Sequence, residues 1–556
     1  MATVIEPGWL SIVPPIAAIV LALIFREVVI SLFAGIWLGA FFLANYDPVA
    51  GTLSVIDRFV IGAVADSDHA AIIVFSLLLG GMVGVMGRSG GTQGIVESLR
   101  GLATTPRRGQ VMAWLAGIFI FFDDYANTLI VGNTMRPVTD RLRVSREKLS
   151  YIVDSTAAPV AVIALISTWV GFEISLIGDS LRTAASQATD PVVAEQLLVA
   201  SANPFNVFLH SIPYLFYPIL AVVFVLLVAA TGRDFGPMLA AERRARSGGG
   251  VIRPGSMPAT DTSGGAVDPV EGAPHRWYNA AVPVLSVIVV ALAGIFATGK
   301  AGLAEGQSGL RAIVGSADPF KSLLWASLTG CIVAIVMAVS QRILKPTEAI
   351  EAWLGGLRSM MLAMVILVLA WSLGAVTKEM GTGAYISTVL KDTLPLQVLP
   401  VLVFVVAALI SFATGTSWGT MAILFPVVVP LAVTMGAGVG FDGGEHYTIL
   451  LGVISSVMAG SIFGDHCSPI SDTTVMSSMA SACDHIDHVR TQLPYALTVA
   501  AVAMLVGDIP TAFGLNPFIS LAVGLVAIWA ILRVVGKPVE VPVAVVETGE
   551  RVVVEQ

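Results

Sequence analysis

The chain has 556 residues, of which 56% are hydrophobic and only 12% are charged, and its mean hydropathy is +0.86. Because an ordinary soluble domain carries about 25% charged residues, this composition excludes a water-soluble enzyme and indicates a polytopic membrane protein. The formal charge of −8 argues against a nucleic-acid partner, and three cysteines are too few for a disulfide framework.

Apolar runs separated by charged residues predict about 11 full membrane spans. No Lys or Arg precedes the first run, so we interpret it as a retained helix rather than a secretory signal. The expected spans lie near residues 9–25, 28–44, 70–87, 150–175, 206–230, 277–298, 320–340, 358–376, 448–482, 491–507 and 515–533.

Two further apolar stretches are interrupted by polar residues and are predicted to be re-entrant hairpins. The first, 110–137, has arginines on both sides, so both of its ends should lie in the cytoplasm. The second, 397–430, is followed by a segment without Lys or Arg, 431–447, and we place both of its ends outside. Polar residues also interrupt the spans at 150–175 and 448–482, which predicts two discontinuous helices.

The segment 231–276 is rich in Arg, Gly, Ser and Pro, which predicts a flexible cytoplasmic linker. It would join a first membrane half, 1–230, to a second, 277–510. An extra C-terminal helix, 511–533, and a cytoplasmic tail, 534–556, would complete the chain.

An internal repeat supports this division. A shift of 290 residues places Gly84 on Gly374 and Phe122 on Phe412 without a gap. Because the flanks of the two hairpins differ in charge, the halves should have opposite orientations. We therefore predict an all-α polytopic membrane protein with two inverted structural repeats, an architecture typical of secondary transporters.

The first hairpin contains Asp123, Asp124, Asn127 and Thr128. A charged side chain at the bilayer centre costs roughly 2.5 to 3.5 kcal/mol on insertion scales unless something compensates it. A bound cation would do so. The alternative is that both acids only cap the following helix.

The first discontinuous helix contains Asp154, Ser155 and Thr156 just before Pro159. A proline there frees backbone carbonyls that could bind a hard cation together with the acid and the hydroxyls. The alternative is that the hydroxyls only bond to carbonyls around a kink.

The second hairpin carries the hydroxyls of Thr414, Thr416, Ser417 and Thr420, which can supply neutral oxygen ligands. Tight packing of small residues is the alternative interpretation.

The second discontinuous helix contains a cluster around Pro469 whose polar members are candidates for ion and proton binding. His466 could titrate near neutral pH, or it could only hydrogen-bond across helices. The other members are Asp465, Ser468, Asp472 and Thr473.

Two further classes of site find little support in the sequence. The spacing of Cys483, His485 and His488 matches no strong zinc pattern, so we expect a solvated loop there and no metal other than Na⁺. No phosphate-binding Gly-x4-Gly-Lys-[Ser/Thr] motif is present, so ATP-driven pumping has no support and no cofactor is expected.

Four motifs resemble those of the NhaC family of sodium/proton antiporters: FFDDYANT at 121–128, VDSTAAPVAVI at 153–163, TGTSWGT at 414–420 and GDHCSPISDTT at 464–474. The resemblance implies two inverted repeats, each with a hairpin and a discontinuous helix, and a dimerising scaffold. It also implies that Asn127 and Thr128 contact sodium and substrate.

These observations predict a non-enzymatic secondary transporter of the cytoplasmic membrane that exchanges Na⁺ for H⁺. Asp123, Asp124, Asp154, Asp465 and Asp472 would bind the proton or the ion, and neutral oxygens would complete the coordination shell. The partners would be Na⁺, H⁺, lipid and a second copy of the chain. Because the family includes malate/lactate exchangers, a carrier of a small organic acid or amino acid is the alternative. An intramembrane protease would also use paired acids, but it has no use for hairpins from both sides of the membrane or for the hydroxyl-rich TGTSWGT motif.

Overall fold

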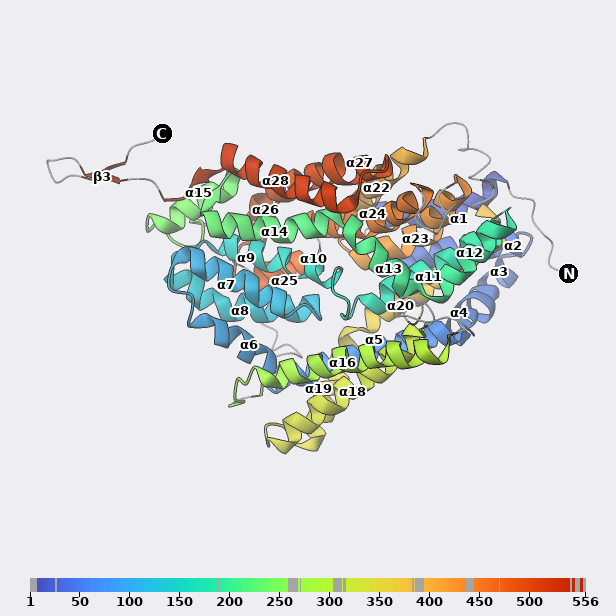
Figure 1. Ribbon diagram of the computed structural model, residues 1–556, viewed down its shortest axis with the longest axis horizontal. Helices are drawn as coiled ribbons and strands as arrows, with labels where there is room; N and C mark the ends of the chain where they lie inside the picture. Colours follow the sequence, from blue (N-terminus) through green and yellow to red (C-terminus); the bar gives the residue numbers. More distant parts are fainter. Residues whose placement is uncertain are drawn as a thin grey trace.

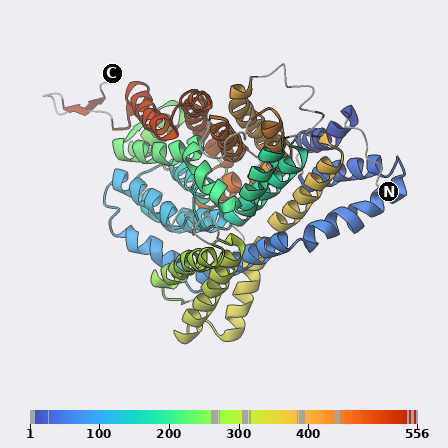
Figure 2. The ribbon, with the colours of Figure 1, turned by 45° about the vertical axis from the view of Figure 1, so that its right-hand side comes forward.

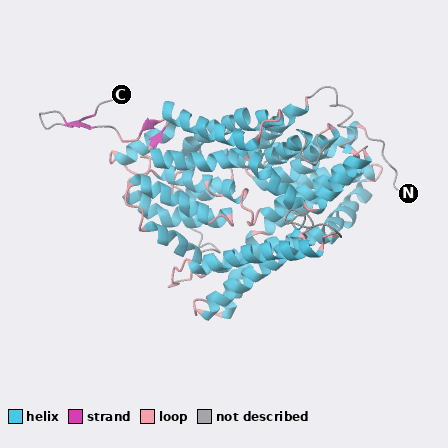
Figure 3. Ribbon diagram, viewed as in Figure 1, coloured by secondary structure: helices cyan, strands magenta, loops and turns pink. Residues whose placement is uncertain are grey.

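A computed structural model describes residues 8–25, 28–188, 190–258, 269–270, 272–303, 313, 317–382, 385, 395–436, 445–469, 471–540, 543–545 and 551–553. The described chain is almost entirely helical, with two small two-stranded ribbons near the C-terminus (Figure 3). Helices are the expected solution for so apolar a sequence, because in lipid each backbone N–H and C=O must be paired within the protein.

The helices before the linker are η1 (Trp9–Ile12), α1 (Val13–Phe25), α2 (Val28–Leu43), α3 (Pro48–Ser54), η2 (Val55–Val60), α4 (Ile61–Ala65), α5 (Ser67–Arg88), α6 (Gly91–Arg100), α7 (Pro106–Phe119), α8 (Asp124–Arg141), α9 (Arg146–Ser155), α10 (Ala158–Ala161), α11 (Val170–Gln187), α12 (Pro191–Ala202), α13 (Pro204–Ser211), η3 (Ile212–Tyr214) and α14 (Phe216–Thr231).

The later helices are α15 (Gly236–Arg246), α16 (Tyr278–Ala301), α18 (Pro319–Ser340), α19 (Pro346–Ser359), α20 (Met361–Glu379), η4 (Leu396–Val398), α22 (Leu399–Thr414), α23 (Ser417–Thr434), α24 (Glu445–Cys467), α25 (Asp472–Ala480), α26 (His485–Val502), η5 (Ala503–Asp508), α27 (Ile509–Ala512) and α28 (Pro517–Val534). The strands are β1 (Arg233–Asp234), β2 (Lys537–Pro538), β3 (Val543–Val545) and β4 (Arg551–Val553).

Ten helices in the described part of the chain are long and apolar enough to cross a membrane. The number rises to eleven if the bent pair Pro191–Ala202 and Pro204–Tyr214, which turns by 90°, is one span. The predicted all-α polytopic membrane protein with about 11 spans is therefore confirmed.

Both stretches predicted to be hairpins are pairs of helices joined by a short turn. The first pair, α7 and α8, is separated by residues 120–123. The second pair, α22 and α23, breaks at Gly415, whose φ of 70° is a left-handed conformation that favours glycine. Thr416 then caps α23 by accepting a hydrogen bond from the backbone N–H of Gly419.

The two spans predicted to be discontinuous are interrupted at their polar residues. In the first, α9 ends at Ser155, the single turn α10 follows, and α11 begins only at Val170. In the second, residues 468–471 separate α24 from α25, and Ser471 caps α25 by accepting a hydrogen bond from the N–H of Thr474. The inverted relation between the halves stays a prediction.

The helices form two groups that are visible in both views (Figures 1 and 2). Helices α16, α18 and α19 pack with α5 along the lower edge, whereas α7, α8, α9 and α25 pack together nearer the C-terminal helix α28. Small residues allow close approach in the lower group, since a Cβ at Gly84 would lie 2.4 Å from the carbonyl oxygen of Ala352.

The first part of the segment predicted to be a flexible linker is ordered, which corrects that expectation. It contains α15, and β1 pairs antiparallel with β2 of the C-terminal tail. Two ion pairs join this segment to α9 and α26: Arg244 contacts Glu147 at 2.9 Å, and Arg253 contacts Asp487 at 2.8 Å. Residues 259–268 and 271 of the predicted linker lie outside the described residues.

The same segment reaches the start of α26. Burial raises the pKa of Asp484, but hydrogen bonds from the backbone N–H groups of Met257, Asp487 and Ile486 outweigh that effect and leave the pKa below its ordinary value. Asp484 thereby caps α26 as a carboxylate.

Candidate functional site

Asn127 joins the first hairpin to the break in the first discontinuous helix. Its side-chain NH₂ donates to the carbonyl oxygens of Gly117 at 2.7 Å, Thr156 at 2.7 Å and Ile120 at 3.2 Å. The side chain is fully buried, and its Oδ1 has no hydrogen-bond partner among the described residues. Three carbonyl acceptors fix the orientation of this amide, so a buried acceptor oxygen remains available for a cation beside the break.

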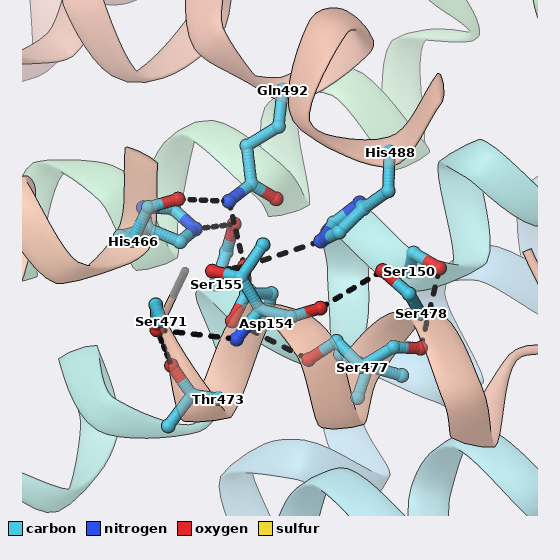
Figure 4. Close-up of polar contacts among 12 residues, drawn as sticks. Ser150, Asp154, Ser155, His466, Ser471, Thr473, Ser477, Ser478, His488 and Gln492 are labelled. Atoms are coloured by element: carbon cyan, nitrogen blue, oxygen red, sulfur yellow. Dashed lines mark hydrogen bonds and ion pairs between the residues drawn. The ribbon is translucent and has the colours of Figure 1, made fainter. Parts of the chain in front are cut away.

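Asp154 lies in the last turn of α9, and residues from the second half of the chain surround it (Figure 4). Its Oδ2 contacts Gln492 Nε2 at 2.6 Å, Thr474 Oγ1 at 3.1 Å and His488 Nε2 at 3.2 Å, and its Oδ1 accepts from Ser477 Oγ at 3.3 Å. Four polar partners on α25 and α26 can stabilise a buried carboxylate here in its charged form.

Ser155 and His466 connect the two discontinuous helices directly. The hydroxyl of Ser155 lies 2.9 Å from Nε2 of His466, and the other ring nitrogen of His466 lies 2.7 Å from the hydroxyl of Tyr217 (Figure 4 shows the Ser155 contact). His466 therefore makes hydrogen bonds across helices, which is one of the two interpretations of this residue. The contact brings the break after α9 next to the C-terminal end of α24.

Asp465 connects α24 to the second hairpin. Ser417 at the start of α23 donates to its carboxylate at 2.6 Å, and Ser468 donates to the carbonyl oxygen of Phe412 at 2.7 Å. Thr474 lies within hydrogen-bond distance of both the Asp154 carboxylate and the Asp465 carbonyl. Asp154 and Asp465, both buried, therefore belong to one polar network at the crossing of two interrupted helices.

Asp123 contacts another part of the chain, the irregular segment before α11. It lies in the turn of the first hairpin and accepts a hydrogen bond from Thr168 at 3.1 Å, in the irregular segment before α11. Asp124 begins α8 and is buried. The structure describes the backbone of Asp472 but not its side chain, so the prediction for that carboxylate lies outside the described residues.

Several predicted hydroxyl ligands bond to the backbone of their own helix. Thr128, Thr156 and Thr414 each donate to the carbonyl four residues earlier. A hydroxyl that donates in this way still has lone pairs for a cation. Thr473 instead lies 3.0 Å from the hydroxyl of Ser471.

Four partners of Asp154 carry no strong signal in the sequence: Thr474, Ser477, His488 and Gln492. Thr474 occurs within the motif GDHCSPISDTT, and His488 lies in a segment whose spacing matches no strong zinc pattern. One signal could have found two of them, because His488 and Gln492 are four residues apart and therefore share one face of α26.

A cavity beside the first hairpin is apolar. It has a volume of about 700 Å³ and is lined by side chains that include Ile118, Phe121, Val160, Ile163 and Ile288. Such walls offer no ligands to a hydrated ion, so this cavity is not itself an ion site.

The contact between the first hairpin and the break is tight enough to test. A Cβ at Gly117 would lie 2.1 Å from Oγ1 of Thr156, so Gly117→Ala should push α7 away and lower the free energy of unfolding by about 1–3 kcal/mol. Thermal unfolding of the purified protein would measure this. Gly62→Ala is the matched control, because nothing lies within 4 Å of a Cβ at Gly62; an equal effect of both changes would contradict the prediction.

Comparison with known proteins agrees with these features. A sequence model of the Na⁺/H⁺ antiporter family matches residues 160–507. A Haemophilus influenzae protein described as uncharacterised is 33% identical over 527 residues, which is 93% of this chain and 94% of the relative. Two further matches are local. An uncharacterised Na⁺/H⁺ antiporter of Haemophilus influenzae is 29% identical over 34% of this chain and 36% of the relative. A malate-2H⁺/Na⁺-lactate antiporter of Bacillus subtilis is 35% identical over 16% of this chain and 17% of the relative.

The fold also has a known counterpart. The crystal structure of the YdaH transporter of Alcanivorax borkumensis superposes with a TM-score of 0.55 at 17% identity, covering 85% of this chain and 90% of that one. The family model spans more than half of the chain, and the motif resemblance points the same way. The chain therefore belongs to the Na⁺/H⁺ antiporter family and is a multi-pass membrane transporter, not an enzyme.

Proposed function

We propose that the protein exchanges Na⁺ for H⁺ by alternating access. The observation that supports this most directly is the pair of buried carboxylates, Asp154 and Asp465, at the crossing of two interrupted helices. Interrupted helices that meet at mid-depth, with acids and exposed backbone groups at the breaks, form ion sites in secondary transporters.

The two carboxylates have different surroundings and are assigned different roles. Four partners hold Asp154, so it serves as a fixed negative charge. Asp465 bonds to Ser417 on the second hairpin, so a change in its occupancy acts directly on a hairpin. We assign the exchange to Asp465: a proton neutralises the carboxylate, a Na⁺ ion binds the charged form, and each excludes the other.

Neutral oxygens complete the proposed coordination shell. Asn127 Oδ1 is the best supported of them, because it is buried and has no partner in the described structure. Thr128, Ser155, Thr156, Thr414, Thr416, Ser417, Ser468 and Thr473 are the other candidate ligands, and Asp123 and Asp124 would add negative charge at the first hairpin. A rearrangement of the two hairpins would bring these groups onto one ion and switch its access.

A second candidate is Na⁺- or H⁺-coupled exchange of a small carboxylate. The local match to a malate-2H⁺/Na⁺-lactate antiporter favours it. Helix N-termini at the hairpins could hold an anion without a basic side chain. Homodimerisation, which the family resemblance implies, is a separate proposal.

Proteoliposomes with an imposed pH gradient separate these candidates. Addition of Na⁺ should dissipate the gradient, Asp124→Asn should slow the dissipation, and protein-free liposomes are the control. Parallel additions of Li⁺, K⁺, malate and lactate give the cation preference and the cargo. If Na⁺ leaves the gradient unchanged while a carboxylate drives uptake, the antiport proposal is wrong and the second candidate replaces it.

A further inference from the structure

Helix α11 carries a carboxylic acid that the proposed ion site does not use. Glu173 is fully buried, with 0% of its surface exposed. Neither carboxylate oxygen has a hydrogen-bond partner among the described residues. A buried polar side chain with no partner is rare and calls for an explanation.

Within the described structure, Glu173 takes part in no ion pair, so no described positive charge compensates this carboxylate. The charged and titratable described side chains on α11 and on the helices packed against it are Asp179 and Arg182 on α11, His69 and Arg88 on α5, Glu195 on α12, His210 on α13, and Lys378 and Glu379 on α20. His69 and Arg182 pair with Asp179, and Glu379 pairs with Arg58.

A charged, unpaired carboxylate in such surroundings would be very costly, so the carboxyl group of Glu173 must be protonated and neutral. Helix α23 packs along α11 and contributes only apolar and hydroxyl side chains. The resting state therefore stores a proton on Glu173, outside the network of Asp154 and Asp465.

The second hairpin packs against the turn of α11 that carries this acid. Trp418, directly after Ser417, packs on Phe172 with ring centroids 4.4 Å apart and on Trp169 at 5.1 Å. Residues four apart on a helix are neighbours, so Glu173 lies one turn beyond Trp169 and next to Phe172. Trp418 thus packs on this turn of α11. The residue before it, Ser417, bonds to Asp465, the proposed exchange carboxylate.

We propose that Glu173 is a second proton-binding site, which releases its proton when movement of the second hairpin carries Trp418 away and lets water reach the carboxyl group. The inference rests on the proposed Na⁺/H⁺ exchange. One proton leaves Asp465 when Na⁺ binds, and another leaves the Glu173 carboxyl for water, which ionises the side chain. After access has switched, water on the opposite side of the membrane returns a proton to the Glu173 carboxylate. The neutral acid is therefore restored before the hairpin closes over it.

The consequence is electrical. An exchange carried by Asp465 alone moves one positive charge in each direction and is insensitive to membrane potential. The additional proton from Glu173 leaves one net charge per cycle, so the rate should depend on the potential. Glu173→Gln preserves the shape of the neutral acid and removes only the titratable proton, so this variant should still exchange Na⁺ for H⁺.

The test uses the full chain in proteoliposomes whose potential is set with K⁺ and valinomycin. Na⁺-driven proton flux in the unaltered protein should rise and fall with the potential, and Glu173→Gln should remain active but lose that dependence. Glu195→Gln, an exposed acid on α12, is the matched control and should behave like the unaltered protein. Tracer Na⁺/Na⁺ exchange, which moves no protons, should be unchanged in both variants.

Each other outcome has a definite meaning. If the Na⁺-driven proton flux depends equally on potential in the unaltered protein and in Glu173→Gln, the second proton site is wrong. A loss of tracer Na⁺/Na⁺ exchange in Glu173→Gln also overturns the proposal, because it would show a structural role for Glu173. An inactive unaltered protein overturns the proposed function instead. In that case infrared spectroscopy still decides: the carbonyl band of protonated carboxylic acids at neutral pH should lose intensity in Glu173→Gln, and an unchanged band refutes the stored proton.

Discussion

Asp465→Asn should abolish Na⁺-driven proton flux and weaken Na⁺ binding by roughly 100-fold, which corresponds to about 3 kcal/mol. The carboxylate supplies the charge that the ion needs in a buried site, and an amide cannot take up or release a proton. Its bond to Ser417 is one of the hydrogen bonds between α24 and the second hairpin, and Ser411 makes another to the carbonyl oxygen of Ser461. Isothermal titration calorimetry would measure the affinity, and gradient dissipation in proteoliposomes would measure the flux.

Asp57→Asn provides the matched control for this change. Asp57 is an exposed aspartate on η2, so the same loss of charge there should leave both measurements unaltered. Thermal unfolding of Asp465→Asn without Na⁺ would establish that the variant is folded. If Asp465→Asn binds Na⁺ as tightly as the unaltered protein does, Asp465 is not part of the ion site.

Lys148→Met should strongly destabilise the protein. Lys148 forms an ion pair with Asp234, their side chains are 0% and 2% exposed, and Tyr495 donates a hydrogen bond to the same carboxylate. Removal of one partner leaves a buried, uncompensated charge, which costs about 3–5 kcal/mol. Chemical or thermal unfolding in detergent would measure the loss.

A double variant makes this prediction specific. Lys148→Met together with Asp234→Asn removes both charges, so it should recover much of the stability that the single change loses. Lys345→Met is the surface control: its side chain is 79% exposed and pairs with Glu348 at 3.4 Å, so its effect should stay below about 1 kcal/mol. A double variant no more stable than Lys148→Met would show that packing, and not charge, is responsible.

Local sequence signals predicted the main interruptions of the fold. Polar residues in apolar stretches marked the turns of both hairpins, and Pro159 and Pro469 marked the breaks in the two discontinuous helices. These signals are local because backbone groups inside a membrane must be paired, so any departure from a helix needs a proline, a glycine or a polar side chain at that point. Asn127 stood out as an amide in an apolar run.

Contacts between distant segments could not be predicted in the same way. The partners of Asp154 lie 320 to 338 residues further along the chain, and no periodicity connects such positions. Helix α15 was missed because its arginines resemble those of a solvated linker, whereas Arg244 pairs with Glu147 on α9. Charge pairing across the fold decides whether such a segment is ordered.

The dependence of Asp154 on α25 and α26 also bears on biosynthesis. Ribosomes deliver the N-terminal half to the bilayer first, and at that stage the residues that will donate to this carboxylate have not been made. The nascent protein must keep the acid hydrated or protonated until Gln492 emerges. The environment of Asp154 is thus completed late in synthesis and requires nearly the whole polypeptide.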